Sequence, residues 1–221
     1  MTSDNSDMTN PVKILSLTPP ALQDNTSDAD RLKGALSLAL TGQVQPRIIT
    51  IDMSLLKALP QLLRQWSYHV RCALFKDRSQ WILTGIRDAE DTRTLAGLAV
   101  DLGTTRVVLR LLNLSTREIL AESSFDNPQI AVGPDILTRI HYADAEGGLE
   151  HINRLIIERL NQEIRELCLS CGIESSDVYS MAVAGNTAMT HLFMGLNPHW
   201  MIREPYIPVV NTPGVVKADE L

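Results

Sequence analysis

Gly97-Leu-Ala-Val-Asp-Leu-Gly-Thr-Thr105 is the stretch of this 221-residue sequence that decides its fold. Its apolar residues predict a short buried strand that brings Asp101 to its end. Gly103 permits a tight turn whose backbone N–H groups can face an anion, and Thr104 and Thr105 add hydroxyl donors. The pattern therefore predicts an anion-binding turn that directly follows a strand.

The residues after this turn predict more strands. Arg106 to Leu114 is apolar and β-branched, Ser115 to Glu118 is typical of a hairpin loop, and Ile119 to Phe125 continues as a strand. We expect three consecutive antiparallel strands between Gly97 and Asp126, with the turn exposed. This arrangement differs from a P-loop or a dinucleotide fingerprint, because both place a glycine loop before a helix.

The residue types in the turn suit a nucleotide triphosphate. Its phosphates need N–H and O–H donors, and a carboxylate holds Mg2+ through the metal's waters, because Mg2+ gives up its hydration shell reluctantly. Asp101, Thr104 and Thr105 supply that set. The alternative is a hairpin whose Asp and Thr side chains satisfy their own turn. The motif by itself leaves both interpretations open.

Further motifs follow this turn in a recognisable order. They are Asn127-Pro-Gln129, Gly133-Pro-Asp135, Arg139-Ile-His-Tyr142, Gly185-Asn-Thr-Ala-Met189, His191, Gly195 and Pro205-Tyr-Ile-Pro208. In that order they resemble the ATPase domain of the reductive activators of corrinoid proteins, which belong to the group of acetate and sugar kinases, heat-shock chaperones, hexokinase and actin. The resemblance extends to the linker and middle domains of those activators, which are similar to Pro19-Pro20, Asp28 to Leu32 and Leu55 to Leu63.

The resemblance implies an α/β fold, in which a small α/β middle domain precedes a ribonuclease-H-like lobe of the actin and hexokinase type and the second lobe is missing. We therefore expect a disordered tail over residues 1–11, a linker and middle domain over residues 12–90, and the truncated N-terminal lobe of an ATPase domain over residues 95–221. The polar composition of residues 1–11 agrees with a disordered tail.

The resemblance also implies ATP and Mg2+ as ligands. It assigns Asp101 to Mg2+ and catalysis, and it assigns Gly103, Thr104, Thr105, Gly185, Asn186 and Thr187 to the nucleotide. The segment Gly185 to Thr187 joins a predicted strand to a helix, where free N–H groups favour an anion. A helix capped by Asn186 or Thr187 is the alternative, and the residues leave both open.

The family implies an ATP-driven reaction that returns a Co(II) corrinoid protein of a methyltransferase system to Co(I). Its ferredoxin domain carries a 2Fe-2S cluster on four cysteines, whereas this sequence has only Cys72, Cys168 and Cys171. The chain is therefore either a fragment or a member that takes its electrons from a separate ferredoxin. Because the second lobe is missing, we expect the chain alone to be a poor ATPase. Two alternatives are a small-molecule kinase of the same superfamily and a non-catalytic docking protein for a corrinoid protein. A homodimer is left open.

Composition narrows the functional class. The apolar fraction of 44% and the charged fraction of 21% are ordinary for a globular protein. A net charge of −6 and a pI near 5.3 argue against a nucleic-acid partner. No stretch approaches the ~20 apolar residues of a membrane span, and no signal pattern begins the chain. With three cysteines and no disulfide framework, we expect a cytoplasmic protein.

Periodicity predicts the remaining elements. In the first part these are a strand at Val12–Leu17, a helix from Asp28 to Gly42, a strand at Arg47–Ile51, a helix capped by Ser54 with a kink or break at Pro60, strands at His69–Phe75 and Gln80–Ile86, and a boundary at Arg87–Thr94. In the second part they are helices at Asp135–Tyr142, Gly148–Cys171 and Thr187–Met194, and a buried strand at Val178–Ala184.

Four other features have ordinary structural interpretations. Cys168 and Cys171 have the spacing of a redox or zinc pair but lack further ligands nearby, which favours structural cysteines. Asp135 and Arg139 predict an exposed ion pair. His191 is expected to pack beside its helix. A separate question concerns the amides of Asn127 and Gln129, which either cap a loop or line the cleft.

Overall fold

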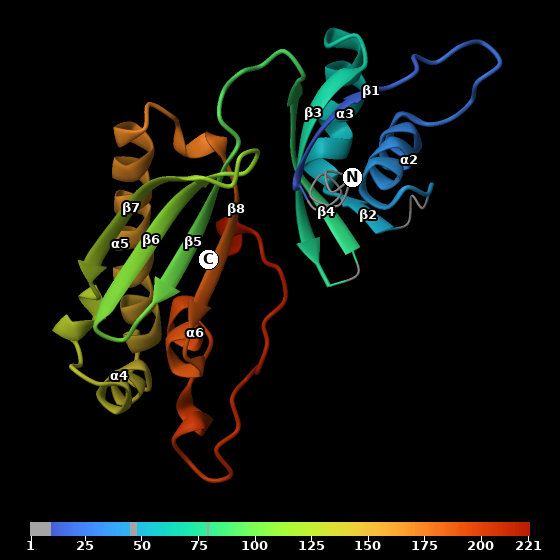
Figure 1. Cartoon of the computed structure of the whole chain (residues 1–221). Coiled ribbons are helices and arrows are strands. Elements are labelled where there is room, and N and C mark those ends of the chain that lie inside the picture. Colours follow the sequence, from blue (N-terminus) through green and yellow to red (C-terminus); the bar gives the residue numbers. More distant parts are fainter. Residues whose placement is uncertain (1–9, 45–47, 79) are drawn as a thin grey trace, which may run out of the picture. The chain divides into compact units, whose positions relative to one another are not determined.

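The computed structural model describes residues 10–44, 48–78 and 80–221, and these form two compact α/β units (Figure 1). The first unit takes the described residues up to Gly97 together with Asn113–Glu118. The second takes Leu98–Leu112 and Ile119–Leu221. Each unit is built on its own four-stranded sheet, so the predicted α/β class is confirmed. Within the described residues no helix combines the length and apolarity needed to cross a membrane.

The first unit is a four-stranded sheet with two helices. Its elements are β1 (Val12–Ser16), α2 (Asp28–Thr41), β2 (Ile49–Ile51), α3 (Met53–Gln65), β3 (His69–Asp77) and β4 (Gln80–Asp88). The strand order is β1-β3-β4-β2, with β2 parallel to β4 and the other neighbours antiparallel. The β3–β4 hairpin runs two residues further on each strand than the sequence predicts. Most of the predicted tail, residues 1–9, lies outside the described residues, as does Arg47.

Helix α2 begins and ends where its sequence signals predict. The Ser27 side chain accepts a hydrogen bond from the Asp30 N–H, and Gly42 takes the left-handed conformation at the C-terminal end. Leu32 and Leu36 of this helix are fully buried. They join a single apolar cluster with leucines of α3 and with residues of the sheet, among them Leu59, Leu63, Val70, Leu74 and Leu83. The first unit therefore has its own core.

Helix α3 begins at another cap than predicted, and of the two outcomes predicted at Pro60, a kink or a break, the break is excluded. Asp52, not Ser54, caps the helix, because the Asp52 carboxylate accepts the N–H of Ser54. Pro60 does not divide it into two helices, since α3 is one element through this residue. Proline removes one backbone hydrogen bond, and burial of Leu59 and Leu63 against the sheet holds the helix together around it.

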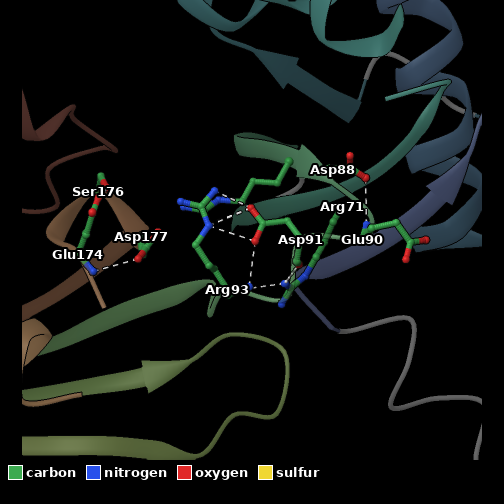
Figure 2. Close-up of polar contacts among 9 residues, drawn as sticks. Arg71, Asp88, Glu90, Asp91, Arg93, Glu174, Ser176 and Asp177 are labelled. Atoms are coloured by element: carbon green, nitrogen blue, oxygen red, sulfur yellow. Dashed lines mark hydrogen bonds and ion pairs between the residues drawn. The ribbon is translucent and has the colours of Figure 1, made fainter. Parts of the chain in front are cut away.

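The charged segment after β4 is a structured part of the first unit (Figure 2). The Arg71 guanidinium donates to the backbone oxygens of Asp91 (3.0 Å) and Arg93 (2.8 Å). The Asp91 carboxylate in turn pairs with Arg93 at 2.6 Å and with Arg87 at 3.5 Å. The side-chain hydrogen bond from Arg93 lowers the pKa of Asp91 to about 2. Ion pairs and hydrogen bonds therefore hold the segment Arg87–Thr94 in place, although its composition predicts a boundary between domains.

The second unit contains the three strands predicted around the opening motif. They are β5 (Ala96–Leu102), β6 (Arg106–Asn113) and β7 (Ile119–Asp126), and β8 (Val178–Gly185) completes a sheet of order β7-β6-β5-β8. Strands β6 and β7 are antiparallel, and only three residues join β5 to β6, which is too short for a crossover. The predicted antiparallel order is therefore confirmed. The helices of this unit are α4 (Ile136–Ala143), α5 (Gly148–Ser170) and α6 (Thr187–Phe193).

The second sheet has an apolar face and a polar face. On β6, Val107, Leu109 and Leu111 are fully buried, whereas Arg106 and Arg110 are exposed and Val108 is half-buried. Alternation of this kind is typical of an antiparallel sheet that packs on one side only. The buried face meets apolar residues of the helices, including Ile152, Ile156, Leu160, Met189 and Leu192. The opposite face is available for polar chemistry.

Strand β8 is in place but is not buried as predicted. It lies at one end of the sheet beside β5, and its second half, from Ala182 to Gly185, is exposed. An apolar strand is buried on both sides only where other elements cover both faces of the sheet. The exposure of Ala182–Gly185 shows that the described elements do not cover both faces at this part of β8.

Candidate functional site

The residues between β5 and β6 form a tight turn that only glycine can begin. A Cβ built on Gly103 would lie 2.2 Å from the backbone oxygen of Arg106, far inside van der Waals contact. Thr104 is half-buried and Thr105 is exposed. The predicted glycine turn followed by two threonines is therefore present, and it joins the end of β5 to the start of β6.

Asp101 lies one residue before the end of β5 and is exposed on the polar face of the sheet. Its neighbours on this face include Arg110, which pairs with Glu122. The hydrogen bond to Glu122, its charge and, to a smaller extent, the charge of Asp101 raise the pKa of Arg110. Among the described residues Asp101 makes no hydrogen bond, so its carboxylate is not used to satisfy the turn.

Buried Asn127 is hydrogen-bonded to the backbone of the turn. Its Nδ2 donates to the backbone oxygen of Gly103 at 2.8 Å, and its own N–H donates to the backbone oxygen of Thr105 at 2.8 Å. Its Oδ1 accepts the N–H of Gln129 at 3.0 Å. Asn127 is 1% exposed, so of the two roles left open by the sequence it takes the loop-capping one. Gln129 is also fully buried and donates to the backbone oxygen of Ile152 in α5.

The corner between β8 and α6 meets the turn through one side chain. Asn186 caps α6 by accepting the N–H of Met189, and its Nδ2 donates to the Thr104 hydroxyl at 3.3 Å. Gly185 lies against Leu102, whose backbone oxygen would be 3.2 Å from an added Cβ. Gly185, Asn186 and Thr187 are all exposed. The structure therefore brings the predicted residues of both segments together, and Asn186 serves as a helix cap as well.

The assembled residues form a donor-rich turn beside one exposed carboxylate. Hydroxyl groups of Thr104 and Thr105 and the backbone of the turn suit a phosphate, and Asp101 suits a cation that the phosphate brings with it. Mg2+ binds through one or two carboxylates, waters and substrate phosphates, so this donor set fits it. No cluster of three or more His, Cys, Asp or Glu side chains that could hold a metal occurs in the described part of the chain.

The cysteines do not fit a 2Fe-2S cluster. Cys72 lies in the buried core of the first unit, where burial raises its pKa to about 12. Cys168 is buried at the end of α5 and Cys171 follows that helix. A cluster of this type needs four thiolates, and the sequence has three cysteines.

Two other predicted residues have defined environments. His191 is fully buried: its Nδ1 lies 2.7 Å from the Thr187 oxygen, and its Nε2 accepts the N–H of Val209. It therefore packs beside its helix as predicted. The predicted exposed ion pair of Asp135 and Arg139 is wrong. Arg139 is fully buried and donates to the Gly133 oxygen at 2.8 Å, while Asp135 caps α4. Burial lowers the pKa of Arg139.

Two family models together match nearly the whole chain. The model described as the RACo linker region matches residues 7–93, and the model described as the RACo middle region matches residues 96–221. The second model covers the residues that are predicted to form the first lobe of an ATPase domain. The junction between the two models falls in the segment that follows β4.

Individual relatives carry related descriptions. The corrinoid activation enzyme RamQ of Eubacterium limosum is 31% identical over an alignment of 193 residues, and the match covers 80% of this chain and 32% of that protein. A solved structure titled reductive activator for corrinoid, iron-sulfur protein has a TM-score of 0.83 and 30% identity. That match covers 99% of this chain and 34% of the solved chain. The chain thus spans about a third of the length of the relatives it matches.

Proposed function

The chain belongs to the RACo family, and from that premise we propose that it is the nucleotide-binding part of an ATP-dependent reductive activator that returns a Co(II) corrinoid protein to Co(I). The turn at Gly103–Thr105 is the observation that carries this proposal. Its carbonyls are held by Asn127 and its threonines lie beside the exposed carboxylate of Asp101. The match of the first unit to the linker model favours an activator over a small-molecule kinase.

In this proposal residues 95–221, which the RACo middle model matches from residue 96, form the first lobe of an actin-like ATPase domain, and residues 12–90 form the linker domain that precedes it. The Thr104 and Thr105 hydroxyls donate to the phosphates of ATP. Asp101 accepts hydrogen bonds from waters of Mg2+ and orients them. Mg2+, when bound, neutralises charge on the phosphates. Gly185, Asn186 and Thr187 border the same site, with Asn186 in contact with Thr104.

The partners follow from the chemistry of the reduction. Converting Co(II) to Co(I) takes one electron, and this chain lacks the cysteines for a cluster that would deliver it. We therefore assign the electron to a reduced 2Fe-2S ferredoxin outside these 221 residues and the cobalt to a corrinoid protein of a methyltransferase system. The printed descriptions of the relatives support the corrinoid partner. The three free cysteines support the cytoplasm, a reducing compartment, as its location.

Calorimetry with ATP, in the presence of Mg2+ and of a chelator, tests the nucleotide site on the chain itself. We expect Asp101→Ala to remove most of the Mg2+-dependent affinity, at least about tenfold, because it deletes the carboxylate that orients the metal's waters. In a full-length activator that carries this segment, ATP hydrolysis should fall at least ~100-fold. Asp101 is exposed, so the free energy of unfolding should change by about 1 kcal/mol or less.

Glu122→Gln is the matched control, because Glu122 is an exposed carboxylate on the same face of the sheet. It should leave ATP affinity unchanged. If the unmodified chain shows no Mg2+-dependent ATP binding, the nucleotide site is refuted. If Asp101→Ala binds Mg2+ and ATP normally, the role of Asp101 is refuted. Corrinoid spectra recorded with the same full-length variant test the coupling, since hydrolysis lost with reduction intact would break it.

A further inference from the structure

We propose that Asn127 is a positioning residue of the nucleotide site, which orients the Gly103–Thr105 turn so that its donors face the phosphate. This inference rests on the proposed function of the turn. Asn127 does not reach the ligand itself, because it is buried to 1% exposure beneath the turn. Its effect is transmitted through two backbone oxygens.

Asn127 donates hydrogen bonds to two backbone oxygens of the turn and makes no bond to the N–H groups of the turn. The side-chain Nδ2 takes the oxygen of Gly103 and the backbone N–H takes the oxygen of Thr105, each at 2.8 Å. Both bonds span more than twenty residues of sequence, from the end of β7 back to the start of β6. One residue therefore clamps both ends of the three-residue turn.

Because a peptide unit is planar, the hydrogen bond to the Gly103 oxygen also fixes the direction of the Thr104 N–H. The C=O and the N–H of one trans peptide unit point in opposite directions. Because the Gly103 oxygen points toward buried Asn127, the N–H of Thr104 in the same peptide unit points away from the protein interior. An outward N–H beside a threonine hydroxyl is the arrangement that a phosphate oxygen requires. Without the clamp the glycine peptide can rotate at little cost.

Asn127 is itself held in one orientation. Its Oδ1 accepts the N–H of Gln129, so its Nδ2 must be the group that faces the Gly103 oxygen. Gln129 is fully buried and donates from Nε2 to the Ile152 oxygen within α5. The longest helix of the unit thereby supports the amide that supports the turn. A group fixed on both sides is suited to a positioning role.

Asn127→Asp is the most selective test, because it keeps the shape and the acceptor for Gln129 but replaces the Nδ2 donor with an oxygen. At neutral pH the introduced carboxylate repels the Gly103 oxygen. We expect Mg2+–ATP affinity, measured by calorimetry on the 221-residue chain, to fall at least about tenfold. At about pH 5 the buried carboxyl is protonated and donates again, so the ratio of variant to unmodified affinity should recover. Asn127→Ala should lose affinity without this recovery.

Asn113→Asp is the matched control, since Asn113 is a turn-capping asparagine at the other end of β6. It should change ATP affinity less than about twofold. A ligand-free measurement accompanies both: 15N order parameters of the Gly103–Thr105 amides, expected near 0.85 in the unmodified chain and below about 0.6 in Asn127→Asp.

The two measurements separate this inference from the proposed function. ATP affinity that survives Asn127→Asp and Asn127→Ala refutes the positioning role while the nucleotide site stands. A turn that loosens in Asn127→Asp but not in Asn113→Asp, in a chain that does not bind ATP, supports Asn127 as the residue that orders the turn and refutes the turn as a nucleotide site. A turn that stays ordered in both Asn127 variants refutes the positioning role whatever the chain binds.

Discussion

Strand β6 has a turn at each end, and the two turns are held in opposite ways. At its C-terminal end, the Oδ1 of Asn113 accepts the N–H groups of Ser115 (2.8 Å) and Thr116 (3.2 Å). At its N-terminal end, Asn127 instead donates to the backbone oxygen of Gly103. One asparagine satisfies donors of its turn and the other satisfies acceptors. The same amide side chain therefore produces two turns with different free groups.

The difference separates a structural turn from a binding turn. A local asparagine that accepts the N–H groups closes its turn, and such caps are readable from sequence because the partners are two or three residues away. A distant asparagine that takes the oxygens leaves N–H groups for something outside the chain. Arg71 also stabilises the structural turn after β6, since it donates to the Ser115 hydroxyl at 2.9 Å.

Gly103→Ala is the strongest test of this comparison. Its Cβ would lie 2.2 Å from the Arg106 oxygen, so the binding turn must move, and ATP affinity should fall about 100-fold with a loss of about 1–3 kcal/mol in the free energy of unfolding. Calorimetry and denaturant titration measure the two effects. Gly214→Ala is the control, because no atom lies within 4 Å of its added Cβ. Normal affinity in Gly103→Ala would show that the turn is not the binding element.

Acid should weaken the charged segment around Asp91, which Arg71 joins to the structural turn through the Asp91 backbone oxygen and the Ser115 hydroxyl. The pKa of Asp91 is lowered to about 2, chiefly by the hydrogen bond from Arg93, so its ionised form stabilises the fold above the unfolded pKa near 4. This contribution is lost as the pH falls from about 4 to about 2. Asp91→Asn should therefore cost about 1 kcal/mol at neutral pH, reduced by solvent screening, and nothing near pH 2.

Denaturant titration across this pH range, with hydrogen exchange at Ser115 and Thr116, checks the expectation. The control is Glu90→Gln, because the Glu90 side chain is 84% exposed and its ion pair with His69, at 3.6 Å, is a surface pair of small energy. Its free energy of unfolding should stay within about 0.5 kcal/mol of that of the unmodified chain across this pH range. Asp91→Asn that remained destabilised at pH 2 would mean that its charge is not the cause.

Asn186→Ala should have the smallest effect on the binding turn. Asn186 reaches it through one exposed bond of 3.3 Å to the Thr104 hydroxyl, so ATP affinity should fall only about threefold. Loss of the α6 cap should lower the free energy of unfolding by about 1 kcal/mol. Asn197→Ala is the control, since Asn197 caps its own turn by accepting the His199 N–H. A loss as large as that of Asn127→Asp would place Asn186, and not Asn127, at the centre of the site.

Sequence patterns predicted the elements whose signals are local. Ser27 and Gly42 mark the ends of α2, and the alternation of Val107, Leu109 and Leu111 gives both the strand and its buried face. The residues of the candidate site on β5 and its turn were also found by sequence, because an apolar strand followed by glycine and threonines is a compact signal.

The errors concern partners that lie far away in sequence. Arg139 has a carboxylate four residues before it, which predicts an exposed pair, but packing of α4 against α6 buries it beside Met189. Asn127 meets Gly103 across 24 residues, and no spacing rule connects them. A sequence signal for its role does exist in hindsight: a strand ending in Asn-Pro supplies a fixed amide, although it does not say which oxygen the amide will meet.

The exposed strand β8 has a consequence for handling the protein. Its sequence, Val-Tyr-Ser-Met-Ala-Val-Ala-Gly from Val178 to Gly185, contains no charge and no proline. Charged side chains and prolines are what natural sheets use to keep an end strand from pairing with another molecule, and β8 has neither. At the end of the described sheet β8 is therefore an uncharged template for strand pairing. We expect self-association in concentrated samples to begin there, although the chain as a whole carries a net charge of −6.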